Sequence, residues 1–529
     1  MAFRLLAGIT RGQLLAGGAA LGGTGLAATV IETDSDKLKA LEAQVQFKTS
    51  SIHPTPPGYS PWQIRNDYPT SELLKELKEQ SKGDSSLPHA PSPLIPPPGF
   101  RDDFEGKRAP WLKIDYEKHP KDYAKKIREY CFEGNVNTGF RLNENPVRDW
   151  YHAPWMHYRD PNSNCTEREP INGFTFERAT PAGEFAATQT KPLQNWAIGF
   201  YNATGATVFG NMWKDPANPD FSQNKEFPVG TCVFKILLND STEESGQMPI
   251  QDGAPVMHGV ISKTTKNGRD RNKHASPLRL IQVDFAVVDK RSPIGWVFGT
   301  FMYNKNHSAK DPWDKLTLVG LQWGNDPWLT DEVYKETEGK AKPRECYISD
   351  EAETIRIQQG GKRPFWGWNG RMNGPADNYI SACASCHSTS TSHPMYNGKV
   401  INGVKQTYGM VPPLTMEKSP QEKEPYTMSD VMVYFRNVMG GVPFDEGVNP
   451  KNPDEYDPSY KSKVKSADYS LQLQVGWANY KKWKEDNESK LQSVFRRTKY
   501  VIGADLAGAS DLSQRDQGRQ EPREDDPVE

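Results

Sequence analysis

One short run of residues, Ser381-Ala-Cys-Ala-Ser-Cys-His387, constrains this 529-residue chain more than any other segment. Cys383 and Cys386 stand three positions apart, and the imidazole of His387 follows at once. This spacing allows two thiols to bond to the vinyl groups of one haem while the imidazole binds the iron from one side. With 6 cysteines and 10 histidines in the whole chain, the pattern is rare by chance. It predicts one covalent haem c, held by Cys383 and Cys386 with His387 as an axial ligand.

Three other interpretations of the same residues stay open at this stage. A thioredoxin-like redox pair places its cysteines at the start of a helix within a βαβ pattern, whereas residues 370–379 have the composition of a loop. A zinc site needs a fourth ligand beyond the motif, and His393 is the residue nearby. A structural disulfide between Cys383 and Cys386 leaves His387 without a role. Haem attachment accounts for all three side chains of the motif.

The residues after the motif suit a small helical domain. Ser429 can cap a helix that ends at Gly440, in which apolar side chains recur at i, i+3, i+4 and i+7, namely Val431, Tyr434, Phe435 and Val438. An apolar stripe also recurs within residues 466–486. With the CxxCH motif near its start, the segment 341–500 resembles a class I c-type cytochrome domain. The resemblance implies a small α-helical haem domain that transfers electrons.

The same resemblance implies a second axial ligand, which in this family is usually a methionine downstream of the histidine. Met439 lies 52 residues after His387, the more usual interval, and Met410 lies 23 residues after it in a Pro-containing loop. Both methionines are therefore candidates. The remaining alternatives are a five-coordinate iron, which would leave a position open for other chemistry, and a bis-histidine iron that uses His393 as its second ligand.

The region before the motif has the character of β-structure. Strand-like runs occupy residues 231–238, 278–288, 295–303 and 316–323. In the second run, Ile281, Val283 and Phe285 fall on one face while Gln282 and Asp284 fall on the other, which is the period of a half-buried strand. Several strands separated by turn-rich loops predict a sandwich or barrel. The expected fold class is α+β, with a β-rich sandwich or barrel-like domain followed by a small α-helical cytochrome c-like haem domain.

The predicted organisation has five parts. The first contains no acidic residue, and its run over residues 14–31 has few polar interruptions, as in a mitochondrial presequence or a bacterial signal-anchor. The predicted parts are a targeting presequence or single membrane anchor (1–31), a Pro-rich linker with a short helix (32–110), a β-rich domain (111–340), the haem domain (341–500) and a disordered tail (501–529).

The remaining cysteines, Cys131, Cys165, Cys232 and Cys346, have no metal-ligand spacing. An oxidising compartment would let them pair, and haem c is attached on the outer side of an energy-transducing membrane. We therefore expect the mitochondrial intermembrane space or inner membrane, with the bacterial periplasm as the alternative. The sequence assigns no pairing, and buried free thiols remain an equal alternative.

Charge and motif content narrow the function. A formal net charge of -2 argues against nucleic acid as a partner. The chain has no nucleophile-elbow, phosphate-loop or zinc-helix motif. The principal prediction is a monohaem c-type cytochrome that carries electrons to or from a redox partner protein or a respiratory complex. The alternatives are a haem-dependent oxidoreductase whose β-rich domain binds a small substrate, and a structural subunit of a respiratory complex.

Overall fold

The computed structural model describes a set of segments concentrated in the middle of the chain. These are residues 67–72, 109–156, 174–215, 219–223, 226–242, 245, 250–259, 262–265, 268–271, 276–362, 364–392, 400–401, 404–405, 434–448, 457–462, 464–481 and 484–485. The chain divides into two compact units, Met1–Asn479 and Tyr480–Glu529. Within the second unit, residues 480–481 and 484–485 are helical. The fold and the site described below belong to the first unit.

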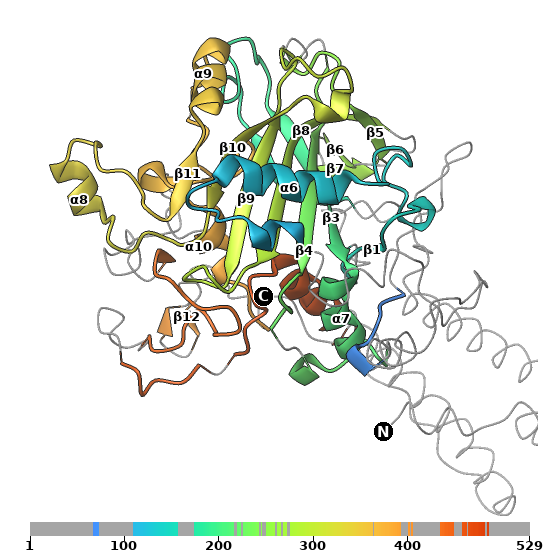
Figure 1. Cartoon of the computed structure of the whole chain (residues 1–529), viewed down its shortest axis with the longest axis vertical. Coiled ribbons are helices and arrows are strands. Elements are labelled where there is room, and N and C mark those ends of the chain that lie inside the picture. The colour runs from blue at the N-terminus through green and yellow to red at the C-terminus, as the bar shows by residue number, and fades with distance from the viewer. Residues whose placement is uncertain are drawn as a thin grey trace, which may run out of the picture. The chain divides into compact units, whose positions relative to one another are not determined.

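The first unit is built mainly from β-strands, with short helices between them (Figure 1). The strands are β1 (Trp150–Tyr151), β2 (Thr175–Thr180), β3 (Leu193–Asn202), β4 (Cys232–Asn239), β5 (Val256–Gly259), β6 (Ser262–Thr265), β7 (Gly268–Arg271), β8 (Ser276–Val288), β9 (Trp296–Tyr303), β10 (Leu316–Gln322), β11 (Cys346–Ile348), β12 (Val400–Ile401) and β13 (Val404–Lys405). The α-helices are α6 (Pro120–Phe132), α7 (Ala203–Met212), α8 (Asp331–Glu336), α9 (Asp350–Gln359) and α10 (Cys383–Ser388), and residues 471–479 are also helical. Single 3-10 turns are Pro110–Lys113, Leu142–Glu144, Phe221–Gln223, Pro312–Asp314 and Trp368–Gly370.

Nine strands form one antiparallel sheet in the order β1-β3-β4-β8-β9-β10-β11, with β2 beside β3 and β5 beside β8. Two further hairpins, β6-β7 and β12-β13, stand apart from it. The four strand predictions over 231–238, 278–288, 295–303 and 316–323 are confirmed as β4, β8, β9 and β10. These four strands are consecutive neighbours in the middle of the sheet.

The predicted fold class is wrong. The described residues form one large antiparallel sheet in place of a sandwich or barrel, and those between 341 and 500 do not form a small α-helical domain of the cytochrome c kind. Residues 346–348 instead add the edge strand β11 to the sheet by pairing with β10. The helix expected from Ser429 to Gly440 is also wrong at its end, because residues 435–439 are not helical. The apolar residues read as a helical stripe, Tyr434, Phe435 and Val438, still pack together with Ile380 and Phe444.

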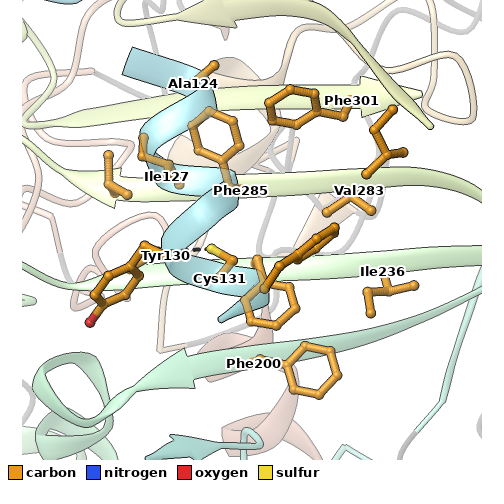
Figure 2. Close-up of a cluster of buried hydrophobic side chains, with 14 of the residues drawn as sticks. Ala124, Ile127, Tyr130, Cys131, Phe200, Ile236, Val283, Phe285 and Phe301 are labelled. Carbon is orange, nitrogen blue, oxygen red and sulfur yellow. Dashed lines mark hydrogen bonds between the residues drawn. The ribbon is translucent and has the colours of Figure 1, made fainter. Parts of the chain in front are cut away.

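One face of the sheet packs against α6, which crosses the strands (Figures 1 and 2). Pro120 at its start and Asp122 in its first turn suit a helix N-terminus. Ile127, Tyr130 and Cys131 lie on the buried side of α6. Sγ of Cys131 lies 3.5 Å from Sγ of Cys232, and neither forms a disulfide. Cys131 and Cys232 are therefore two buried thiols in contact with each other. Cys165 lies outside the described residues.

The second face of the sheet is covered as well, which changes the interpretation of β8. Ala352 and Ile355 of α9 pack on this face. A register shift between β4 and β8 moves Ile281 to this second face, so the expected alternation starting at Ile281 is interrupted. Gln282, expected on a solvent-facing side, is completely buried. Gln282 and Asp284 of β8 therefore lie on a covered face of the sheet, the face that also carries α10, with Gln282 fully buried and Asp284 partly buried.

Within the described segments, no helix combines the length and the apolar content needed to cross a membrane. The predicted anchor, residues 14–31, lies outside them, as does the predicted tail.

Candidate haem-attachment site

Helix α10 contains the CxxCH motif and lies on the second face of the sheet, over β9 and β10. Its N-cap residue, Ala382, provides no side-chain hydrogen bond. A distant side chain takes that role, because the backbone N–H of Ala384 donates to Oε1 of Gln322 at 2.9 Å. The Ser385 hydroxyl donates to Oδ1 of Asn325 at 2.7 Å. These two contacts attach the motif directly to β10 and to the loop that follows it.

One turn of α10 brings the two thiols of the motif to the same side, since residues i and i+3 are neighbours on a helix. Cys383 and Cys386 form no disulfide and are partly buried. Sγ of Cys383 donates to Oδ1 of Asn373 at 3.3 Å. Burial raises the pKa of both thiols, that of Cys386 to about 12. A redox-active cysteine pair needs a thiol with a lowered pKa, so this environment argues against a thioredoxin-like pair.

The imidazole of His387 is held in one orientation. Its Nδ1 lies 2.8 Å from the backbone oxygen of Tyr469, and its ring packs on Phe298 of β9 with the ring centres 5.0 Å apart. Burial lowers the pKa of His387 to about 4, and the charge of Lys235 acts in the same direction. The ring is therefore neutral at pH 7. Because a carbonyl oxygen only accepts, Nδ1 carries the proton and Nε2 keeps its lone pair, as in a metal-bound histidine.

The carbonyl that holds His387 comes from a strained turn. Asp468 and Tyr469 have φ angles of 48° and 64°, the left-handed region that costs an aromatic residue roughly 1–2 kcal/mol. Asp468 accepts the indole N–H of Trp296 on Oδ1 at 3.0 Å and the backbone N–H of Phe227 on Oδ2 at 2.5 Å. The Tyr469 hydroxyl donates to the backbone oxygen of Val438 at 2.6 Å. Contacts from three separate segments thus maintain the turn that orients the imidazole.

The loop before the motif is organised by one buried arginine, Arg371, which is 1% exposed. Its guanidinium donates to the backbone oxygens of Asn325, Asp326 and Leu329 at 2.7–2.8 Å and lies over the ring of Phe435. Burial lowers the pKa of Arg371 to about 10, which leaves it charged at pH 7. This side chain ties the segment entering α10 to the loop after β10.

Met439 lies at the turn between β8 and β9. Its side chain is 44% exposed, and its Sδ lies 3.2 Å from where a Cβ atom on Gly295 would stand. In the described part of the chain, no interaction links Met439 to His387, so its role as second axial ligand stays a prediction. Met410 and His393 lie outside the described residues. No group of three His, Cys, Asp or Glu side chains suited to a metal ion occurs among the described segments.

The residues that are present fit a haem c. The two thiols are unbridged and on one side of a helical turn, and the adjacent imidazole is neutral with Nδ1 already hydrogen-bonded. Cys383 and Cys386 would hold the group, and Nε2 of His387 would bind its iron.

Sequence reasoning missed the residues that support the motif. Nothing in the sequence predicts the left-handed backbone conformation of Tyr469, because aromatic residues rarely adopt a positive φ. Lys235 also went unnoticed, although it lies on β4 directly opposite Asp284 of β8. A lysine within an otherwise apolar strand was the available signal for a buried charge.

Comparison of the chain with models of known protein families, with curated protein sequences and with solved structures gave no match.

Proposed function

We propose that this chain binds one haem c through Cys383 and Cys386, with His387 as an axial ligand, and that it carries electrons as a monohaem protein. One observation supports the proposal above all others. Two thiols one helical turn apart, not joined by a disulfide, stand beside a neutral imidazole whose Nδ1 is hydrogen-bonded to the backbone oxygen of Tyr469. When bound, the haem supplies an iron that changes between the ferric and ferrous states.

The chain's own residues have distinct tasks in this proposal. Each thiol adds across one vinyl group, so that sulfur bonds to one vinyl carbon and the hydrogen goes to the other, with no net oxidation. Burial keeps both thiols protonated, because it raises their pKa. Thioether formation needs a nucleophilic thiolate. We therefore expect attachment to take place before α10 packs on the sheet.

The proposed location and partners follow from the same chemistry. Haem c attachment belongs to the outer side of an energy-transducing membrane, in the mitochondrial intermembrane space or the bacterial periplasm. The proposed partner is a redox protein or a respiratory complex that exchanges single electrons with the haem.

A second candidate function is a haem-dependent oxidoreductase that acts on a small polar substrate. The observation in its favour is the ion pair of Lys235 and Asp284, 3.4 Å apart on the sheet face that carries α10. The ferric absorption spectrum and cyanide binding separate the two candidates. A low-spin iron with two protein ligands resists cyanide, whereas a high-spin iron with an open position binds it.

The primary test is a pyridine haemochrome spectrum of the full chain, produced in a host that attaches haem c, together with haem staining after denaturing electrophoresis. We expect covalent haem in the natural sequence and its loss in the double variant Cys383→Ala/Cys386→Ala. Cys346→Ala is the matched control, because Cys346 is also a free thiol but lies outside the motif. Absence of covalent haem from the natural sequence, or its retention in the double variant, would overturn the proposal.

A further inference from the structure

A row of polar residues crosses the second face of the sheet next to α10. Lys235 of β4 is directly opposite Asp284 of β8, and Asp284 is directly opposite Thr300 of β9. The row ends in glycine on both sides, at Gly199 of β3 and Gly320 of β10. Charged residues are seldom placed in the middle of a covered sheet without a task, because burial of a charge is costly.

This row lies close to the CxxCH side chains. Thr300 is two residues from Phe298, the ring on which His387 packs, and alternate residues of a strand lie about 7 Å apart on one face. The charge of Lys235 contributes to the lowered pKa of His387. The charge of Asp284 contributes to the raised pKa of Cys383. The charges of the row therefore affect the protonation of the side chains in the CxxCH motif.

Asp284 is the residue of the row best placed to exchange a proton. Its Oδ1 accepts hydrogen bonds from Oγ1 of Thr300 and Nε2 of Gln282, both at 2.7 Å. Its Oδ2 faces Nζ of Lys235 at the longer distance of 3.4 Å. The side chains of Lys235 and Asp284 are 25% and 19% exposed to solvent. A proton can thus reach Oδ2 without breaking the two short hydrogen bonds on Oδ1.

The charges around Asp284 favour binding a proton. Gln282 links Asp284 to a second carboxylate, because its Nε2 also donates to Oδ2 of Asp377 at 2.9 Å. Burial first, and then the charge of Asp377, raise the pKa of Asp284 to about 7, against the opposing charge of Lys235. The charges of Glu177, Asp284 and Asp377 outweigh burial and raise the pKa of Lys235, so one cation faces three carboxylates.

We infer that Asp284 binds a proton in step with reduction of the haem proposed above. In this step a one-electron donor gives one electron to the iron, and the Asp284 carboxylate takes one proton from solvent onto Oδ2. Oxidation reverses both transfers. The physical reason is charge compensation, since an added electron makes the nearby negative cluster less stable until a proton neutralises part of it. The inference rests on the proposed haem attachment and adds a proton-coupling residue to it.

The test is a spectroelectrochemical titration of the haem-loaded full chain between pH 5 and 9. We expect the midpoint potential to fall as pH rises across the range in which Asp284 titrates, by up to about 59 mV per pH unit for one proton per electron. In Asp284→Asn the potential should become independent of pH over this range. Asp115→Asn is the matched control, because Asp115 forms an exposed pair with Lys118 and should leave the slope unchanged.

A second variant and a second measurement keep the inference testable if Asp284→Asn does not fold. Thr300→Val removes one hydrogen bond to the carboxylate, raises the pKa of Asp284, and should move the pH window upward. Redox-induced infrared difference spectra should show a protonated carboxyl group that appears on reduction and is missing in Asp284→Asn.

The outcomes separate the two proposals. A chain without covalent haem by pyridine haemochrome would refute the proposed function itself. A haem-loaded chain whose potential does not depend on pH, or whose slope persists unchanged in Asp284→Asn, would refute the inference alone.

Discussion

Replacement of Asp468 by alanine tests whether the strained turn that holds His387 is maintained by side-chain hydrogen bonds. Asp468 accepts two buried donors, the indole N–H of Trp296 and the backbone N–H of Phe227. Its own backbone has a φ of 48°, and Tyr469 follows with 64°. Alanine has no carboxylate to accept these two hydrogen bonds, so they no longer hold the turn in its strained conformation.

The magnitude follows from the two orphaned donors. Each buried N–H left without an acceptor costs about 1–3 kcal/mol, so two cost about 4 kcal/mol. Removal of a buried carboxylate returns part of this cost, because burial raises the pKa of Asp468 and thus disfavours its charged form. Alanine also tolerates the left-handed region less well than aspartate. We expect a net loss of about 3 kcal/mol in the local opening free energy, which corresponds to about 100-fold.

The assay is amide hydrogen exchange followed by mass spectrometry on peptides that cover residues 464–475. The reporting amides are those of Ser470 and Gln474, which donate to Ala467 and Ser470 at 3.0 and 3.1 Å. Local exchange is preferred to global denaturation because a chain of this size need not unfold in one step. Asp468→Asn keeps one acceptor oxygen and should show about half of the effect in kcal/mol.

The control variant is Asp457→Ala, whose carboxylate binds Ser459 in a turn at the surface. It should change exchange in residues 464–475 by less than threefold. If Asp468→Ala also stays within threefold, the hydrogen bonds of Asp468 do not hold the turn, and the account of how His387 is oriented is incorrect.

Four further predictions concern the supports of the site. Arg371→Lys loses the planar fork that donates to three backbone oxygens, so we expect the local opening free energy of the loop after β10 to fall by about 3 kcal/mol, measured by amide hydrogen exchange on peptides that cover residues 325–330. Gly367→Ala places a Cβ 1.8 Å from the backbone oxygen of Ser381 and should reduce the yield of folded protein severely, whereas Gly139→Ala, with open space but a φ of 60°, should cost only about 1 kcal/mol. Gln322→Leu removes the acceptor for the first turn of α10, and maleimide labelling of Cys383 in haem-free protein should become several-fold faster. Finally, burial raises the pKa of Asp468, so the protonated carboxyl group contributes stability at low pH, and this contribution should be lost as pH rises through the folded-state pKa. The loss, followed by hydrogen exchange of residues 464–475 against pH, should be missing in Asp468→Asn.

Local patterns in the sequence predicted the central strands well. The runs that became β4, β8, β9 and β10 are rich in β-branched and aromatic residues and are bounded by turn residues. The way in which these strands are covered was not predicted. Helix α6 has its apolar residues at helical spacing, and that signal would have argued for a helix over one face of a single sheet. Several strands separated by turn-rich loops predict a sandwich or barrel when no helix is expected to cover the sheet.

The error at the C-terminal end has a different cause. Tyr434, Phe435 and Val438 were assigned to a helix from their spacing, and they are indeed buried. Residues in an irregular loop can reach one cluster when other segments, here through Ile380 and Phe444, complete it. Periodicity in a short window cannot distinguish this arrangement from a helix, because the pattern reports burial and not backbone conformation.

The contrast between the motif and the fold has a physical basis. Two thiols and an imidazole in the CxxCH spacing need only one helical turn to stand together, and α10 is barely longer than that. The remaining requirement is an acceptor for Nδ1 of His387, which a backbone carbonyl on any fold can provide. Here that carbonyl comes from Tyr469, 82 residues away in the chain. Because the motif needs only one helical turn and one carbonyl acceptor, it indicates a chemistry but not a fold. The fold around it depends on which other segments of the chain pack against that turn.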